Sequence, residues 1–262
     1  MPPPDTHVPR DGATAPRRRA EGEEALAAAN GGAEKRRYVR RVFSEIAPRY
    51  DLLNHVLSLN VDRAWRRSAL GELAWQRRPD GVFLDLCAGT LDVAARLAHS
   101  PGFRGVVVAA DFAEPMLRAG TGKAPPHAAL PVVADALELP LADGSVAGAV
   151  VAFGIRNVAG LDAALREVHR VLARDARFVV LEFSTPRAPL VRAAYHAYFH
   201  AVLPAVGRLV SGHRSAYSYL PESVANFPAG EELAARMRAA GFHEVRWRPL
   251  TLGIAALHVG VR

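Results

Sequence analysis

The middle of the chain alternates short apolar runs with stretches of helical period. Five apolar runs have the length of buried strands, and they cover residues 81–87, 106–111, 131–135, 146–153 and 177–183. Between the last two, Leu161–Ala173 repeats apolar residues every three or four positions, which is typical of an amphipathic helix. Strands alternating with helices predict a parallel sheet with right-handed crossovers and helices on both faces.

The order of elements changes near the C-terminus. A helical stretch at 231–240 stops at Gly241, and two further strand-like runs follow at about 243–249 and 254–261. The segment 251–253 between them is short enough for a hairpin, so we expect the last strand to be antiparallel. The chain therefore predicts an α/β fold with a mostly parallel seven-stranded sheet and an antiparallel last strand.

The N-terminal part has a different character. Residues 1–34 are rich in Pro, Gly, Ala and charge, which predicts a disordered tail, and 35–262 then form a single domain. From Lys35, a helical spacing of Tyr38, Val42 and Ile46 accompanies a basic face that reaches Arg41. Such a face is usually just solvated, and the alternative is a membrane-surface or partner element. Residues 186–228 form an irregular insertion rich in aromatic residues and histidine.

Composition narrows the classes of protein that fit. The chain has 262 residues and half are apolar, enough for one full core. Its one cysteine, Cys87, excludes a disulfide framework or a multi-cysteine metal site and suits a reducing cytoplasm. No apolar run has the roughly 18–20 residues that span a bilayer, and we see no signal core. The net charge of +7 favours anionic partners or reflects a general drift towards arginine.

The most informative stretch is F-L-D-L-C-A-G-T-L-D at 83–92. A strand turns at Gly89 into a helical pattern, and the next apolar run ends on Asp111. This is the first half of a nucleotide-binding βαβ unit, in which the acid accepts hydrogen bonds from ribose hydroxyls. The alternative is a βαβ unit that binds nothing. A dinucleotide site would use G-x-G-x-x-G, so the single glycine favours S-adenosylmethionine, which has no pyrophosphate.

Several separated segments resemble the ubiquinone/menaquinone biosynthesis C-methyltransferases. The first signature matches at 50–65, including Tyr50, Asp51, Asn54, Ser58 and Trp65. Further matches are F-G-I-R-N-V at 153–158 and the segments 170–172, 178–184, 217–228 and 250–260. The resemblance covers about 38–262 and implies a Rossmann-like class I methyltransferase that uses S-adenosylmethionine to methylate a quinol ring with a polyprenyl tail. It also implies that 35–75 form an N-terminal helical lid.

The resemblance implies a set of cofactor-binding residues. Asp85 and Gly89 would shape the turn, and Thr90 would face the methionine moiety. Asp111 would hold the ribose, and the pair Asp135 and Ala136 would meet the adenine. For Asp85 an alternative stays open, in which it only braces the turn through backbone N–H groups. We expect no metal site, because the histidines of the insertion lack metal-ligand spacing.

The expected catalytic residues are Arg156, Asn157, Tyr50 and Asp51. Ring methylation needs an electron-rich carbon, and Arg156 could stabilise the developing phenolate by charge-assisted hydrogen bonds. Arginine is a poor base, so a water or a carboxylate would take the proton. The alternatives are a salt bridge for Arg156 and a turn or helix cap for Asn157. The resemblance gives Tyr50 and Asp51 as lid or substrate-pocket residues.

The chain also departs from the family pattern. Where the family has Gly-Gly-Thr-Gly-Asp, residues 88–92 read A-G-T-L-D. We expect Thr90 to cap the helix and Leu91 to be its first residue, with a side chain that points away from the ligand. Residues 173–176 replace a Lys-Pro-Gly-Gly turn, and we expect them to form a surface loop.

The resemblance thus implies methylation of demethylmenaquinol to menaquinol, with the ubiquinol precursor as a second acceptor. The alternatives are a methyltransferase for another aromatic small molecule, a non-catalytic fold relative, and a nucleic-acid methyltransferase. A nucleic-acid methyltransferase usually carries a recognition module or a base-flipping motif. We find neither in this sequence, so we expect no nucleic-acid partner. The expected partners are the polyprenyl quinol, a transient membrane surface and, in one alternative, a second copy in a homodimer. We expect a cytoplasmic protein, peripheral at the inner face of the membrane.

Overall fold

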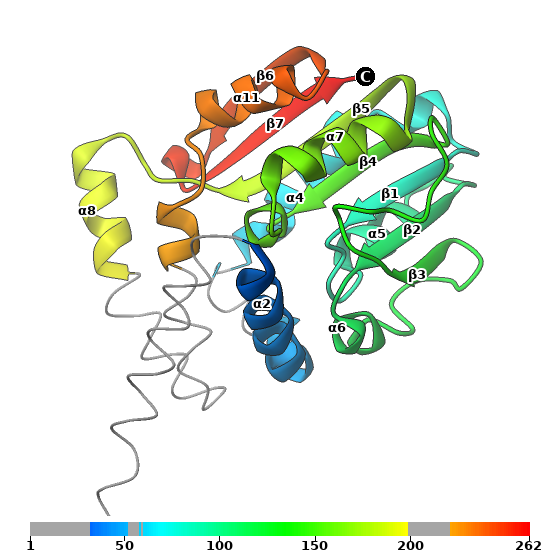
Figure 1. The fold of residues 1–262 in the computed structure, drawn as a ribbon, viewed down its shortest axis with the longest axis horizontal. Helices are drawn as coiled ribbons and strands as arrows, with labels where there is room; N and C mark the ends of the chain where they lie inside the picture. The colour runs from blue at the N-terminus through cyan, green and yellow to red at the C-terminus, as the bar shows by residue number, and fades with distance from the viewer. Residues whose placement is uncertain (1–31, 52–57, 59, 199–220) are drawn as a thin grey trace, which may run out of the picture.

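The computed structural model describes residues 32–51, 58, 60–198 and 221–262. Seven strands form one sheet in the order β3-β2-β1-β4-β5-β7-β6 (Figure 1). The strands are β1 Val82–Leu86, β2 Val106–Asp111, β3 Ala129–Val133, β4 Val146–Ala152, β5 Leu172–Phe183, β6 His243–Leu250 and β7 Ala255–Val261. Strands β1 to β5 pair in parallel, and β7 is antiparallel to both of its neighbours, β5 and β6.

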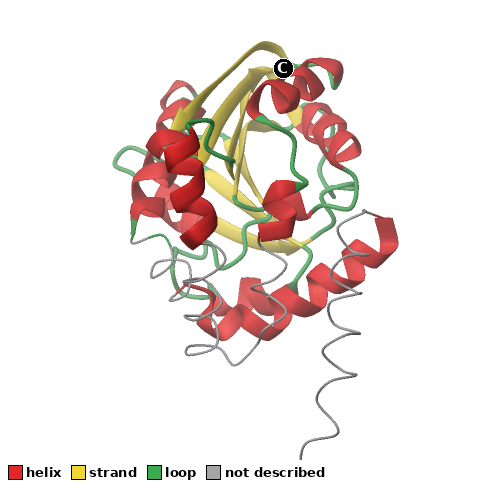
Figure 2. Ribbon diagram, turned by 90° about the vertical axis from the view of Figure 1, so that its left-hand side faces the viewer, coloured by secondary structure: helices red, strands yellow, loops and turns green. Residues whose placement is uncertain are grey.

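Helices cover both faces of this sheet (Figure 2). The α-helices are α2 Gly32–Ile46, α4 Val61–Leu73, α5 Asp92–Ala98, α6 Glu114–Ala119, α7 Leu161–Val171, α8 Pro189–Ala197 and α11 Gly230–Ala239. Short 3₁₀ turns lie at η1 Ala47–Arg49, η2 Trp75–Arg77, η3 Ile155–Asn157 and η5 Thr251–Gly253.

Each face has its own apolar core, as the alternation of side chains along the strands requires. Phe83, in β1, belongs to the core formed with α4 and α5, and its neighbour Leu84 belongs to the core formed with α7 and α11. Both side chains are almost completely buried. A sheet buried on two faces explains why the central strands appear in the sequence as continuous apolar runs.

The predicted fold class is confirmed, and the largest differences from the predicted boundaries lie at β3, at the end of α7 and at the start of β5. Strand β3 ends at Val133, so Asp135 lies beyond it in a short bridge with Glu138. Helix α7 ends at Val171, and β5 begins at once with Leu172. Residues 173–176 therefore belong to β5 and not to a surface loop. They form an irregular part of the strand, where the register shifts and Asp175 has a positive φ of 61°.

The predicted tail and insertion lie partly outside the described residues. Helix α2 begins at Gly32, inside the tail predicted for 1–34, whereas 1–31 are not described. Asn54 and residues 199–220, which include His213 and Tyr217, also lie outside. Within the insertion, the structure shows α8 and a helical turn at 221–225. Among the described helices, none combines the length and the apolar character needed to cross a bilayer.

The carboxyl ends of β1 and β4 meet closely. Cys87 follows β1 with φ 53°, and Phe153 follows β4 with φ 64°, so both strands turn sharply where they end. A side chain on Gly154 would place its Cβ only 2.3 Å from the Cβ of Cys87. Glycine therefore allows the two turns to touch, and the edge of the sheet opens beside them.

Candidate active site

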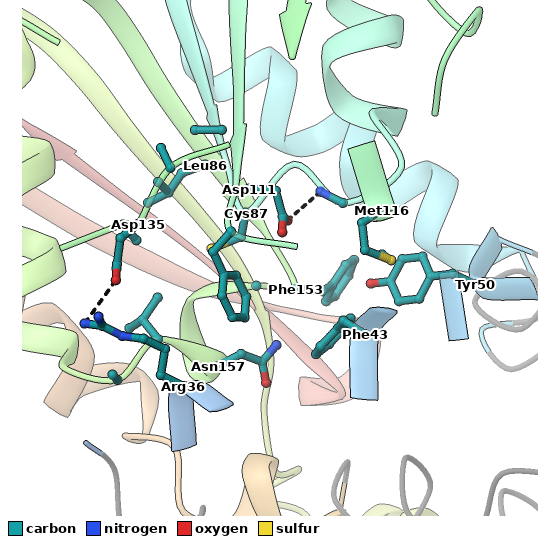
Figure 3. A pocket seen from close by; sticks show the side chains of 18 residues that line it. Arg36, Phe43, Tyr50, Leu86, Cys87, Asp111, Met116, Asp135, Phe153 and Asn157 are labelled. Carbon is teal, nitrogen blue, oxygen red and sulfur yellow. Dashed lines mark hydrogen bonds and ion pairs between the residues drawn. The ribbon is translucent and has the colours of Figure 1, made fainter. Parts of the chain in front are cut away.

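A pocket lies at the carboxyl ends of β1, β2 and β4, under helix α2 (Figure 3). Its space, including the part open to solvent, is about 660 Å³. The lining residues are Arg36, Phe43, Tyr50, Leu86, Cys87, Gly89, Ala110, Asp111, Phe112, Met116, Ala134, Asp135, Ala136, Phe153, Gly154, Asn157, Val158 and Ala159. The walls are mainly apolar, with a few polar groups that could fix the orientation of a ligand.

Asp111 ends β2 and faces the pocket, as the sequence predicts (Figure 3). Its Oδ2 accepts the N–H of Gly89 at 2.9 Å, and its Oδ1 accepts the N–H of Ala113 at 2.8 Å. Burial raises the pKa of Asp111, and the backbone N–H bonds oppose that rise. This carboxylate ties the glycine turn to the strand end and keeps acceptor capacity towards the pocket, because each carboxylate oxygen can accept more than one hydrogen bond.

Leu91 is not the first helical residue, which corrects the prediction. It is the N-cap of α5 and has a left-handed backbone with φ 67°. Its side chain is 3% exposed and belongs to the core with α4 and α5, so it does point away from the pocket. Helix α5 begins at Asp92, and Thr90, also buried, makes no cap bond to it.

Asp85 and Thr90 lie next to the pocket but do not line it. Asp85 Oδ2 accepts the N–H of Ala94 at 2.9 Å, so its carboxylate fixes the first turn of α5 to the end of β1. Complete burial raises the pKa of Asp85 to about 7, despite that hydrogen bond. This geometry matches the alternative in which Asp85 only braces the turn.

Asp135 and Ala136 both line the pocket, and Asp135 lies on the side opposite Met116 (Figure 3). Asp135 Oδ1 accepts the N–H of Leu137 at 3.0 Å, and its Oδ2 pairs with Arg36 of α2 at 3.0 Å. The carboxylate expected to meet adenine is therefore held by a cation from the N-terminal helix.

Asn157 lies in η3 and points into the pocket (Figure 3). Its Oδ1 is buried and, in the part of the chain that the structure describes, has no hydrogen-bond partner. A buried acceptor without a donor costs free energy, so such an atom in a pocket favours a ligand with a polar group. Together with two carboxylates and apolar walls, this amide oxygen fits an amphiphilic ligand such as S-adenosylmethionine.

Arg156, next to Asn157, is buried below the pocket rather than lining it. Its Nη1 donates to Glu182 Oε1 at 2.6 Å and to the carbonyl of Phe153 at 2.5 Å. Its Nε donates to Ser223 Oγ at 3.3 Å. Glu182 also accepts the N–H groups of residues 156 and 183. The guanidinium thus joins the ends of β4 and β5, the salt bridge given as the alternative reading.

Tyr50 and Asp51 follow η1, and the structure gives them different surroundings. Tyr50 lines the pocket, and its ring lies 5.9 Å from that of Phe43. Asp51 does not line it; its carboxylate accepts the Thr90 hydroxyl and pairs with Lys123. Of the expected site residues, Tyr50, Gly89, Asp111, Asp135, Ala136 and Asn157 meet in one pocket, and Asp51, Asp85, Thr90 and Arg156 surround it.

The sequence did not point to several residues of this site. Arg36, read as part of a solvated or membrane face, lines the pocket, and Lys35 donates to the Arg156 carbonyl at 2.8 Å. Desolvation, with the charge of Arg156, lowers the pKa of Lys35. Phe43 and Met116 add apolar walls. In the described part of the chain, no cluster of three or more His, Cys, Asp or Glu side chains could hold a metal ion.

Solved structures with similar folds include a methyltransferase and a cyclase. A SAM-dependent methyltransferase from Thermotoga maritima superposes with a TM-score of 0.60 at 17% identity, covering 84% of this chain and 98% of that one. The [4+2]-cyclase SpnF gives 0.62 at 16% identity, covering 86% and 96%. At these identities, the likeness supports the fold alone.

Sequence relatives are much closer. The demethylmenaquinone methyltransferase of Thermus thermophilus is 50% identical over 225 residues, which are 84% of this chain and 100% of that protein. The ubiquinone/menaquinone biosynthesis C-methyltransferase UbiE of Geotalea uraniireducens is 43% identical over 231 residues, 87% and 97% of the two chains. The ubiE/COQ5 methyltransferase family model matches residues 31–262. The chain therefore belongs to the ubiE/COQ5 methyltransferase family, as the sequence motifs predicted.

Proposed function

We propose that this protein transfers a methyl group from S-adenosylmethionine to a ring carbon of a reduced polyprenyl quinol. The acceptor is demethylmenaquinol, which becomes menaquinol, and the ubiquinol precursor is a second acceptor. One observation carries the proposal: a pocket with two carboxylates, an unpaired amide oxygen and apolar walls lies at the carboxyl edge of the sheet. The relatives that are named for these quinones align with 84% and 87% of this chain.

The residues around the pocket would hold the cofactor by charge and shape. Asp111 would accept hydrogen bonds from the ribose hydroxyls, and Asp135 would accept one from the exocyclic amine of adenine in exchange for Arg36. Ala136 would pack on the adenine ring. Gly89 has φ 53°, and a Cβ there would lie 3.3 Å from Met116, so glycine leaves room for close approach. The bound cofactor supplies a methyl group on a positively charged sulfur.

The acceptor needs an electron-rich ring carbon, which an ionised quinol hydroxyl provides. Arg156, which lies behind the pocket lining and pairs with Glu182, would stabilise the developing phenolate electrostatically, and Asn157 would orient the ring by its amide. Tyr50 and Phe43 would exclude water from the ring face. Glu182 already accepts three N–H groups. We therefore assign the departing ring proton to a water rather than to this carboxylate.

Methyl transfer to demethylmenaquinone, kept reduced by dithionite, tests the reaction. Transfer should need the reduced ring, and the ubiquinol precursor should be accepted. If small phenols without a prenyl tail react with equal kcat/KM, the function belongs to the alternative with another aromatic acceptor.

Calorimetric titration tests the cofactor site separately. Asp111→Ala should weaken S-adenosylmethionine binding at least tenfold, about 1.4 kcal/mol, through lost ribose contacts and a loosened Gly89 turn. Asp111→Asn keeps one side-chain acceptor for the turn and should lose less. Equal affinity of all three proteins would remove Asp111 from the site, and absence of binding by the unaltered protein would favour a non-catalytic relative.

A further inference from the structure

A polar cluster outside the pocket joins three separate segments of the chain. Lys123 Nζ lies 2.5 Å from Asp51 Oδ2 and 2.7 Å from Asp92 Oδ1. The other oxygen of Asp51 accepts the hydroxyl hydrogen of Thr90. None of these four residues lines the pocket. The cluster therefore has a role that direct ligand contact does not explain.

Two of the three segments line the pocket, and the third follows α6, which lines it with Met116. Asp51 ends residues 32–51, here called the strap, which comprises α2, η1 and residues 50–51 and gives the pocket Arg36, Phe43 and Tyr50. Thr90 belongs to the turn between β1 and α5, the same turn that contains Gly89, and Asp92 is the first residue of α5. Lys123 lies in the loop after α6. The cluster thus connects the strap to the β1–α5 turn, which lines the pocket with Gly89.

The loop that contains Lys123 is itself fixed against that turn. At Gly120 an added Cβ would lie 2.5 Å from the carbonyl oxygen of Thr90 and 2.6 Å from the Cγ of Leu91. Only glycine allows this approach, so the loop after α6 packs directly on the backbone of residues 90–91. Lys123 follows Gly120 by three residues, so it comes from a loop that packs on the β1–α5 turn.

The charges favour an ammonium between Asp51 and Asp92, in addition to the contacts that Lys35 and Arg36 make elsewhere on the strap. The side chains of Lys123, Asp51 and Asp92 are 27%, 35% and 21% exposed, so water screens them only in part. Without the Lys123 ammonium, the carboxylates of Asp51 and Asp92 would face each other and repel. Asp92 is held in the first turn of α5, where its charge also suits the helix dipole. Asp51, and the strap with it, would be displaced.

We propose that Lys123 is a positioning residue that latches the strap closed over the cofactor pocket through Asp51. The inference rests on the proposed function for the identity of the ligand beneath the strap. Tyr50 adjoins Asp51, and its ring carbon Cε1 would lie 3.8 Å from a Cβ on Gly89, so the latch also sets the distance between the Tyr50 wall and the cofactor turn. The bound cofactor leaves only when the Asp51–Lys123 contact opens.

Hydrogen–deuterium exchange of the protein without cofactor tests the latch itself. In Lys123→Met, peptides covering residues 38–51 should exchange at least tenfold faster than in the unaltered protein. Adding Asp51→Asn to Lys123→Met removes the repulsion and should slow exchange again, and Lys123→Arg should keep most of the protection. The matched control is Arg118→Met, which breaks the exposed Arg118–Glu114 pair on α6 without touching the strap. Equal exchange in Lys123→Met and the control would overturn the latch.

Stopped-flow dissociation of S-adenosylhomocysteine, the demethylated cofactor, tests the coupling to the pocket. Lys123→Met should release it roughly tenfold faster, with the double variant intermediate and Arg118→Met unchanged. Faster exchange with unchanged dissociation would overturn the link between strap and cofactor. If the unaltered protein binds no S-adenosyl compound, the proposed function fails. The statement that the strap retains the cofactor then fails with it. The exchange experiment would still decide whether Lys123 holds the strap.

Discussion

At Leu91 the left-handed backbone, and not helix propensity, decides which residues are favourable. A left-handed conformation costs a non-glycine residue about 1–2 kcal/mol, which the family's glycine avoids. Here the buried leucine side chain offsets that strain, because it packs in the core with α4 and α5. Helix propensity predicted a helical residue, and tertiary packing overrode it.

We therefore predict the stability order unaltered protein, Leu91→Gly, Leu91→Ala. Both variants lose a buried side chain, at roughly 2–5 kcal/mol for a leucine truncated to alanine. Leu91→Gly recovers about 1 kcal/mol of that because glycine is unstrained at φ 67°. Urea denaturation measures the order. If Leu91→Ala is the more stable of the two, the left-handed conformation is wrong, and a strong gain in cofactor affinity for Leu91→Gly would mean that Leu91 obstructs the pocket.

Arg156 needs a test that separates catalysis from folding. Removing it alone would leave Glu182 buried without its cation, which typically costs 3–5 kcal/mol. We predict that Arg156→Ala is both unstable and at least roughly 100-fold slower in methyl transfer. The paired variant Arg156→Met/Glu182→Gln should recover much of the stability but not the rate, with cofactor binding nearly intact.

Arg156→Lys should recover part of the rate, because a point charge replaces the planar fork. Single-turnover methyl transfer and thermal unfolding of the same samples make the comparison. Near-normal turnover in the paired variant would reduce Arg156 to a structural salt bridge and move the search to Asn157 and Tyr50.

At the scale of elements, hydrophobic periodicity predicted the strands and helices whose residues follow a regular local pattern. The seven strands, α7 and α11 appear where alternation and helical spacing place them. The local pattern does not predict the start of β5, because Arg174 and Asp175 lack strand character. Hydrogen bonds between residues 175–176 and Arg262, which follows β7, join this part to the sheet. The basic face of α2 was also misjudged in part. Arg36 meets Asp135 only after the chain has folded, and no local pattern signals a partner so distant in sequence.

The packing of α11 on β7 predicts a dependence of stability on pH. His258 of β7 is buried, its ring stacks on Trp247, and its Nε2 bonds to the Gly230 carbonyl at 2.8 Å. That bond requires a hydrogen on Nε2, so Nδ1 carries none in the neutral ring, and this buried atom has no hydrogen-bond partner among the described residues. Burial lowers the pKa of His258, and the Gly230 bond opposes this.

Protonation therefore favours the unfolded chain. Above about pH 6.5 His258 is neutral in both states, and as the pH falls below that value only the unfolded imidazole takes up a proton. The free energy of unfolding should then fall by up to about 1.4 kcal/mol per pH unit from this group. His258→Gln keeps a donor for Gly230 and should show a shallower slope in denaturation between pH 7.5 and 5.5. Parallel slopes for the two proteins would contradict the assignment, since His169, whose pKa burial also lowers, is common to both.

At the scale of the whole molecule, the position of the site could be predicted, but its closure could not. Parallel strands bring their carboxyl ends to one edge, so Asp111, Asp135 and Asn157 had to lie near one another. The strap that covers them depends on long-range pairs, above all Lys123 with Asp51. Lys123 lies in a glycine-flanked loop that resembles any surface turn, and its role became visible only from the three-dimensional contacts.

The same long-range pairs change the prediction for the membrane surface. Lys35 and Arg36 are engaged by the fold, so the cations of α2 that remain exposed include Arg37 and Arg40. Elsewhere, Leu190 and Leu252 are 84% and 75% exposed. A basic residue near an anionic surface contributes about 1 kcal/mol, so such a protein would adhere reversibly and in a salt-sensitive way.

We predict that the protein floats with anionic liposomes at low salt, and much less with neutral liposomes or at high salt. Arg37→Glu/Arg40→Glu should weaken this adhesion strongly, because each reversal replaces attraction by repulsion. The matched control is Arg63→Glu/Arg67→Glu, which reverses two exposed charges about one helical turn apart on α4. If both pairs weaken flotation equally, the net charge of the whole protein drives adhesion and α2 has no special part. Failure to float with anionic liposomes at low salt would leave delivery of the quinol to a partner protein, because a polyprenyl tail keeps this substrate in the bilayer.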